Sequence, residues 1–170
     1  MGCTPHGVRA VSPYIWTMNS REQSQPLRVL VAYEDFAAGT RAMAMLNRVE
    51  SQSGEPGELT HMMWRFDVVA DADFFELAVK EALKADIIVI AAREGKGLPQ
   101  RIKDWIARWL LMKQSRPLAL VATLDYRPVK ASSEAPVLPY LAKLASFGKM
   151  QFFANGSSPD TGNDLANLRG

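Results

Sequence analysis

The sequence predicts one three-layer α/β/α domain built on a five-stranded parallel β-sheet. Short continuous apolar runs, such as 27–33 (LRVLVAY) and 86–92 (DIIVIAA), are typical of strands that are buried on both faces. These runs alternate with helical stretches, and parallel neighbours need such crossovers between them. The 170 residues are 48% hydrophobic and 22% charged, which suits a single globular domain with a substantial core.

Each element of this sheet has its own pattern. The strands are expected over 27–33, 61–69, 86–92, 117–123 and 151–154, and the helices over 41–50, 71–84, 99–113 and a stretch marked by Val137, Leu141 and Leu144. Apolar and polar residues alternate over 61–69, which favours an edge strand, whereas 86–92 is apolar enough for the centre. Right-handed crossovers from a central first strand then predict the order 2-1-3-4-5.

The two ends of the chain differ from this domain. Residues 1–26 are rich in Gly, Pro, Ser and Gln without any period, and Met18 opens a polar start, so residues 1–17 could derive from an upstream start site. Residues 155–170 are rich in Gly, Ser, Asn and Asp, which predicts a disordered tail. The domain is therefore expected to cover 27–154.

Composition excludes several classes of function. A single cysteine, Cys3, leaves no intrachain disulfide to form, and with the lack of a secretory signal this favours a cytoplasmic location. Only His6 and His61 are present, so a multi-histidine metal site is not expected. A net charge of +2 without a basic run predicts no nucleic-acid partner. No stretch approaches the roughly 20 apolar residues of a membrane helix.

Topology predicts where a ligand would bind. In open parallel sheets, ligands bind beyond the carboxyl ends of the strands, at the point where the strand order reverses. For this order the crevice is formed by the loops 34–40, 93–98 and 124–133. None of these loops carries a nucleophile elbow, a P-loop or a metal-ligand motif, so no catalytic residue is assigned.

The middle loop carries a family resemblance. Residues 85–104 (ADIIVIAAREGKGLPQRIKD) resemble the segment of NADPH-dependent FMN reductases that contacts the flavin, and residues 116–125 and 135–153 resemble the following strand, helix and strand of that family. The matching positions are Ala85, Asp86, Glu94, Pro99, Ile102, Lys103 and Asp104. The resemblance implies a flavodoxin-like fold and an FMN site.

The resemblance also implies which residues would hold FMN. The flavin ring would pack on Arg93, Glu94, Gly95, Lys96 and Gly97 and on Leu124, Asp125 and Tyr126. Gly39, Thr40 and Arg41 would hold the phosphate at a helix N-terminus, where backbone N–H groups attract anions. The alternatives for the last two are a helix cap at Thr40 and a solvated Arg41.

Two departures from the family argue against tight FMN binding. Gly95 and Lys96 stand where the family has an aromatic residue that packs on the flavin ring. Glu34 and Asp35 open the first loop, and two carboxylates near a phosphate dianion repel it unless they are paired or turned away. We therefore expect FMN to bind weakly or not at all. An alternative environment for this acidic pair is an ion pair with Arg93 or Lys96.

The acidic pair also resembles the Mg²⁺-binding acids of receiver domains, with Thr123 at the position of their switch hydroxyl. However, Ala91 and Ala92 occupy the region where a receiver carries its phosphorylated Asp, and without a carboxylate no acyl phosphate forms. Three functional hypotheses remain: a non-catalytic binding module diverged from flavin reductases, an FMN-dependent NAD(P)H oxidoreductase, and a receiver-like domain that cannot be phosphorylated.

The helix at 99–113 predicts an association surface. Ile102, Ile106, Trp109 and Leu110 fill the stripe that one helix buries on a sheet. Trp105, Leu111 and Met112 fall at the borders of this stripe or outside it, and exposed neighbours of this size favour contact between molecules. Because flavin reductases of this group form dimers or tetramers, we expect a homodimer with this helix near the two-fold axis.

Overall fold

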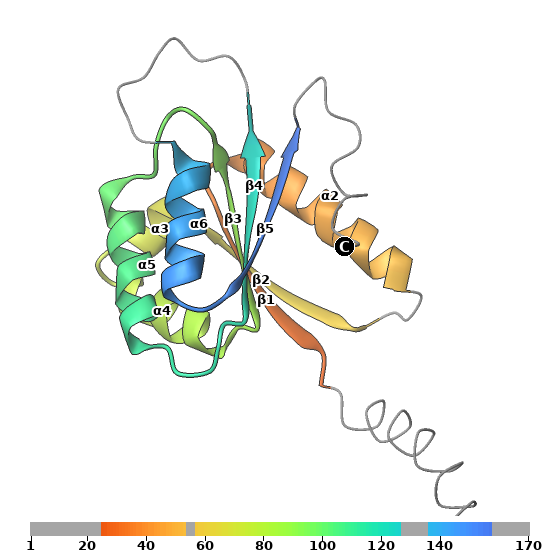
Figure 1. Cartoon of the computed structure of the whole chain (residues 1–170), viewed down its shortest axis with the longest axis horizontal. Coiled ribbons are helices and arrows are strands. Elements are labelled where there is room, and N and C mark those ends of the chain that lie inside the picture. Colours follow the sequence, from red (N-terminus) through yellow and green to blue (C-terminus); the bar gives the residue numbers. More distant parts are fainter. Residues whose placement is uncertain (1–24, 54–56, 127–135, 158–170) are drawn as a thin grey trace, which may run out of the picture.

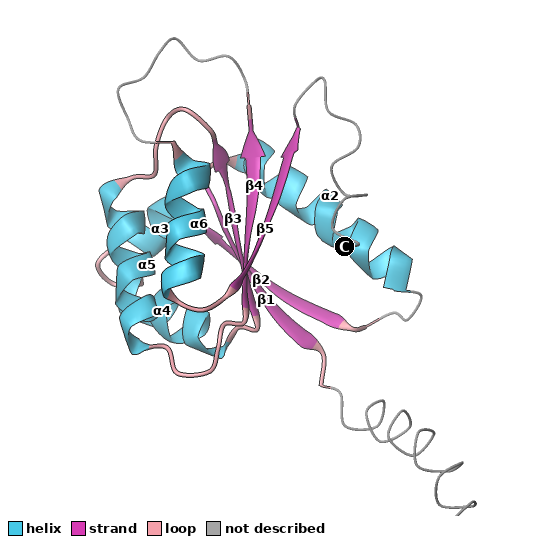
Figure 2. Ribbon diagram, in the orientation of Figure 1, coloured by secondary structure: helices cyan, strands magenta, loops and turns pink. Residues whose placement is uncertain are grey.

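A parallel sheet between two unequal helical layers forms the computed structural model, which describes residues 25–53, 57–126 and 136–157 (Figures 1 and 2). The elements in chain order are β1 (Leu27–Tyr33), α2 (Phe36–Ser53), β2 (Leu59–Arg65), α3 (Phe66–Ala70), α4 (Phe75–Lys84), β3 (Ile87–Arg93), α5 (Gln100–Met112), β4 (Ala119–Asp125), α6 (Val137–Phe147) and β5 (Gln151–Ser157).

The strand order is β2-β1-β3-β4-β5 and every neighbouring pair is parallel, which confirms the predicted topology. The register places Val31 beside Val89 and Val89 beside Val121, so these residues form one row across the sheet. Strands of this kind are covered on both faces, and their apolar runs therefore do not alternate.

The two helical layers differ in size. Helices α3, α4, α5 and α6 pack on one face of the sheet and enclose the larger core, whereas α2 lies on the other face (Figure 2). Ala38, Ala42 and Leu46 of α2 pack against Val31 and Val89. None of the described helices is long and apolar enough to cross a membrane.

Helix α2 begins five residues earlier than predicted, at Phe36 rather than Arg41. The cause is Asp35, whose Oδ1 accepts a hydrogen bond from the backbone N–H of Ala38 at 2.9 Å. A carboxylate in this position caps a helix and compensates its N-terminal dipole. Gly39, Thr40 and Arg41 consequently lie inside the helix, and the expectation that they form its N-terminus is wrong.

The predicted second strand, 61–69, divides into strand β2 and helix α3. Phe66 and Val69 are three residues apart and both are buried, a spacing that a helix satisfies and a strand does not. The helix predicted from Asp71 begins instead at Phe75, because the Asp71 side chain accepts the N–H of Asp73 at 2.8 Å and forms a turn. Pro99 lies immediately before α5, one position earlier than predicted.

The last strand is longer than predicted. Strand β5 runs to Ser157 beside β4, so residues 155–157, predicted as the beginning of a disordered tail, pair with Thr123, Leu124 and Asp125. Strands β3 and β4 likewise extend to Arg93 and Asp125. Apart from Gln25 and Pro26, the predicted N-terminal tail lies outside the described residues, as does the remainder of the C-terminal one.

Trp105 is a core residue, which corrects its predicted place at a dimer interface. Its side chain is 0% exposed and packs edge to face on Trp109, with ring centroids 6.1 Å apart. Helix α5 is covered by α3 and α4 on one flank and contacts α6 at its other side, so the buried stripe is wider than the sheet alone requires. Leu111 and Met112 are exposed, as predicted.

Trp105→Ala should lower the free energy of unfolding by about 3–5 kcal/mol, because it leaves a cavity in the core. Urea denaturation followed by circular dichroism measures this loss. Leu111→Ala is the matched control on the same helix and should change stability by less than about 0.5 kcal/mol. Equal losses for the two variants would show that Trp105 is not packed in the core.

Candidate functional site

The carboxyl ends of β1, β3 and β4 lie side by side at one edge of the sheet and bring together residues 34–35, 93–98 and 124–126 of the predicted crevice (Figure 1). Residues 127–133 of its third loop lie outside the described residues. The Glu34 N–H donates to the Ala91 carbonyl at 2.9 Å, and the Glu94 N–H donates to the Asp125 carbonyl at 3.0 Å. These two bonds continue the sheet past the end of each strand. Glu34, Asp35, Arg93, Lys96 and Asp125 therefore meet as the sequence predicts, and we call these five residues, with Arg41, the edge cluster.

Asp35 has two roles in the edge cluster. Its Oδ1 caps α2 through Ala38, and its Oδ2 lies 2.6 Å from Nη2 of Arg93. The Ala38 N–H and, to a smaller degree, the Arg93 guanidinium hold the pKa of Asp35 below its usual value, although desolvation opposes them. The same hydrogen bond raises the pKa of Arg93. Asp35 thus occupies the anion position at this helix N-terminus.

Glu34 binds the loop that follows β3. Its Oε2 accepts the backbone N–H of Arg93 at 2.9 Å, and its Oε1 lies 3.3 Å from Nζ of Lys96. The Glu34 side chain is 16% exposed, whereas that of Lys96 is 65% exposed, so water reaches this pair from the lysine side. Both carboxylates of the acidic pair are consequently held by Arg93 and Lys96, which confirms the ion-pair alternative predicted for them.

Arg41 is not the solvated residue that the sequence suggested. It projects from α2 toward the end of β4, where its Nη1 lies 3.4 Å from Oδ2 of Asp125. The two side chains are 22% and 12% exposed. Within the described part of the chain, Nε and Nη2 of Arg41 are buried and have no hydrogen-bond partner. The N–H groups on two nitrogen atoms of Arg41, Nε and Nη2, therefore have no acceptor among the described residues.

Glu94, predicted to contact a flavin, instead caps α6. Its Oε1 and Oε2 accept the backbone N–H groups of Val137 and Leu138 at 2.8 and 3.1 Å. The carboxylate thereby satisfies two N–H groups that the first turn of a helix leaves free. No local pattern could have found this contact, since the residues are 43 and 44 positions apart.

The loop after Glu94 has a backbone that favours glycine. Gly95 and Gly97 have φ angles of 87° and 71°, and a side chain at either position would strain the backbone. In the resembled family an aromatic residue stands in the region of Gly95 and Lys96, and at Gly95 such a side chain would be strained in this loop conformation.

The other predicted contact residues are engaged within the protein, although Thr40 is exposed. An ideal Cβ on Gly39 would lie 3.0 Å from Cδ2 of Tyr33, so this glycine lets α2 approach β1. The Thr40 hydroxyl donates to the Phe36 carbonyl at 2.9 Å and does not cap the helix. The Leu124 side chain is buried in the larger core, and Tyr126, half-buried, packs against that core. Burial raises the pKa of the Tyr126 phenol.

The receiver-like positions carry no matching chemistry. Ala91 and Ala92 are buried in β3, and the Thr123 hydroxyl lies 3.5 Å from Sδ of Met45. Among the described residues, no three or more His, Cys, Asp or Glu side chains are grouped as metal ligands.

Comparison with known proteins identifies the type of fold. No protein-family model matches the chain, and no curated protein sequence matches it. Among solved structures, the metal-soaked Flv1 flavodiiron core from Synechocystis sp. PCC6803 is similar over 89% of this chain, with 16% sequence identity and a TM-score of 0.51. The fold is flavodoxin-like. The chain spans only 36% of the length of the flavodiiron chain.

A second solved structure, Smu.1420 from Streptococcus mutans UA159, is similar over 82% of this chain and 92% of its own, with 12% identity and a TM-score of 0.47.

Asp35→Ala should lower the free energy of unfolding by about 1–2 kcal/mol, because it removes the cap of α2. Asp35→Asn keeps a capping oxygen and should cost less. Since the pKa of Asp35 is lower in the folded chain than in the unfolded chain, its charge stabilises the fold above a pH of about 4 and loses this effect on acidification. The stability difference between wild type and Asp35→Asn should therefore shrink below that pH in urea titrations. A difference that grows on acidification would contradict the assignment.

Proposed function

We propose that this chain is a flavodoxin-like binding module that recognises a partner and does not use flavin for catalysis. The observation that carries the proposal is the edge cluster, in which the residues at the expected ligand crevice bind one another. Its carboxylates are Glu34, Asp35 and Asp125, and its cations are Arg41, Arg93 and Lys96. The six formal charges sum to zero.

A phosphate dianion would meet an unfavourable site here. Anions bind at a helix N-terminus because its N–H groups and dipole are free to receive them. At α2 the Asp35 carboxylate already takes that position, and Arg93, the nearest cation, is paired with it. FMN would have to displace one or both of these contacts and then lie close to Glu34. The described residues therefore do not fit the phosphate of FMN.

The ring of a flavin would also lack its usual contact. The described residues of the loop after β3, Glu94 to Leu98, include no aromatic side chain, and the backbone at Gly95 and Gly97 would strain one placed there. Stacking on an aromatic side chain contributes about 1–3 kcal/mol for a nucleic-acid base, which is a guide for a flavin ring. Its loss corresponds to one or two decades of affinity, since about 1.4 kcal/mol is tenfold.

One observation favours the second candidate, an FMN-dependent NAD(P)H oxidoreductase. The buried Nε and Nη2 atoms of Arg41 lack partners among the described residues, and a phosphate oxygen could accept from them after a local rearrangement. Such a cofactor would supply the hydride transfer, and the protein would supply position and electrostatics. In that case Asp35 and Glu34 must turn away from the phosphate.

We expect the purified chain to be colourless and to bind FMN with a dissociation constant above the micromolar range. Neutralising the acidic pair, by Glu34→Gln with Asp35→Asn, should strengthen FMN binding by about tenfold, because Arg93 and Lys96 are then free to attract phosphate. Titration followed by flavin fluorescence measures both constants.

Glu50→Gln with Glu58→Gln is the matched control, since it removes the same charge near the opposite end of the sheet and should leave FMN binding unchanged. Yellow protein with stoichiometric flavin would overturn the proposal and favour the oxidoreductase hypothesis instead.

A further inference from the structure

Strand β5 is the last strand of the sheet, and one row of its backbone groups has no partner among the described residues. The Gln151 N–H donates to the Leu118 carbonyl at 2.9 Å, so Gln151 and Phe153 direct their backbone groups toward β4. Successive strand residues point in opposite directions, and those of Phe152 and Ala154 therefore point outward. No described strand lies beyond β5. This edge can accept one further strand.

The edge lacks the features that usually prevent such pairing. Exposed edge strands are commonly protected by charged residues or proline. Residues 150–157 (MQFFANGS) contain neither. The opposite edge strand, β2, differs because it carries His61 and Arg65, both exposed.

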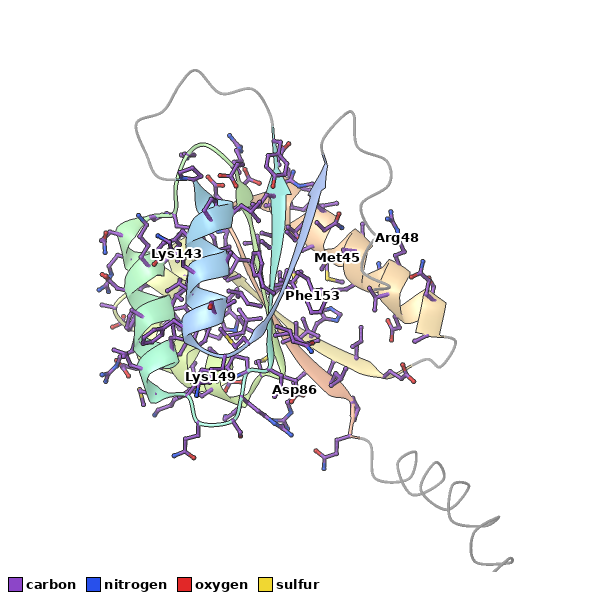
Figure 3. All side chains as sticks on the ribbon, viewed as in Figure 1. Met45, Arg48, Asp86, Lys143, Lys149 and Phe153 are labelled. Carbon is purple, nitrogen blue, oxygen red and sulfur yellow. The ribbon has the colours of Figure 1, made fainter. Side chains whose placement is uncertain are left out.

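The surfaces beside this edge carry partly exposed apolar side chains, with one cation, Arg48, on the flank of α2 whose Arg41 and Met45 contact β4. Phe153 lies beside Val121 on the α2 face of the sheet and is 41% exposed (Figure 3). On the other face, Lys103 of α5 lies 5.5 Å from the ring of Tyr140, which identifies the flank of α6 that faces α5. Leu138 and Ala142 are each two residues from Tyr140, about 200° around the helix, and so lie on the flank away from α5. Both are half-buried.

We propose that β5 pairs antiparallel with β5 of a second copy of this chain, so that two sheets join into one. With Phe153 opposite Phe153 on the two-fold axis, Phe152 faces Ala154 and their outward backbone groups bond in both directions. Gln151 then faces Asn155, an amide beside an amide. The strand is thus complementary to itself, and no charged side chain of β5 meets its copy across the axis.

The exposed end of α5 is less suited to a second copy. Leu111 and Met112 are exposed there, but Lys113 lies beside them, as does Arg108, whose Nε is 3.7 Å from Oε1 of Glu76. A two-fold contact centred there would place the Lys113 cations of both copies close together, which is unfavourable. The proposal therefore retains the predicted homodimer but places its interface at β5 instead of α5.

Hydrogen exchange on the wild-type full chain tests the pairing without a mutation. In concentrated solution, where sedimentation should give twice the chain mass, the amides of Phe152 and Ala154 should be protected. On dilution these two amides should lose protection at least about tenfold more than those of Gln151 and Phe153, which bond to β4. A wild-type chain that sediments as a monomer at every concentration, or outward amides whose protection ignores concentration, would overturn the proposal.

Two variants then locate the interface. Phe153→Asp places carboxylates opposite each other, and Ala154→Pro removes an outward N–H while leaving the bonds to β4; each should raise the dimer dissociation constant at least about tenfold. Met62→Asp is the matched control, because Met62 is 42% exposed on the other edge strand. Variants at 153 and 154 that remain folded dimers by circular dichroism and sedimentation contradict the proposal, as does equal dissociation by Met62→Asp.

Discussion

Charge compensation at the carboxyl edge of the sheet is the constraint on which the site depends. Parallel strands bring the ends of β1, β3 and β4 to one place, and the chain carries acids at two of these ends and a cation at the third. Isolated charges that are partly buried are costly, so each must find a partner. Asp35 and Glu34 find theirs in Arg93 and Lys96, and Asp125 finds one in Arg41. The crevice that the topology creates is consequently occupied by the protein's own side chains.

The topology of the fold was predictable because it follows from the buried runs. Strands β1, β3 and β4 are covered on both faces, and their continuous apolar sequences predict this burial. The boundaries of the elements depend instead on single side chains. Asp35 moved the start of α2, and its position before an Ala-rich helix is a capping pattern that the prediction overlooked in favour of Gly39 and Thr40. Trp105 was misplaced because periodicity gives the angle of a residue on its helix but not how far the neighbouring helices reach around it.

The sequence predicted which residues gather at the site better than it predicted the contacts between them. Topology brought Glu34, Asp35, Arg93 and Lys96 together correctly, since it fixes which strand ends adjoin. The contact of Glu94 with α6 and that of Arg41 with Asp125 join residues far apart in the sequence, and no local pattern records them. Two edges of the sheet thus contrast: at the carboxyl edge the charged side chains pair with one another, whereas the outward backbone groups of β5 have no partner among the described residues.

The measurement that tests the self-paired edge most directly is a double-mutant cycle between Asp35 and Arg93. Urea denaturation of wild type, Asp35→Asn, Arg93→Gln and the double variant isolates the energy of this pair, because the asparagine still caps α2. We predict a favourable coupling at neutral pH and low salt that decreases as salt is added, because the pair is exposed to solvent. A coupling of zero under these conditions would show that Arg93 is free to bind another anion, and it would contradict the account of a crevice closed by its own charges.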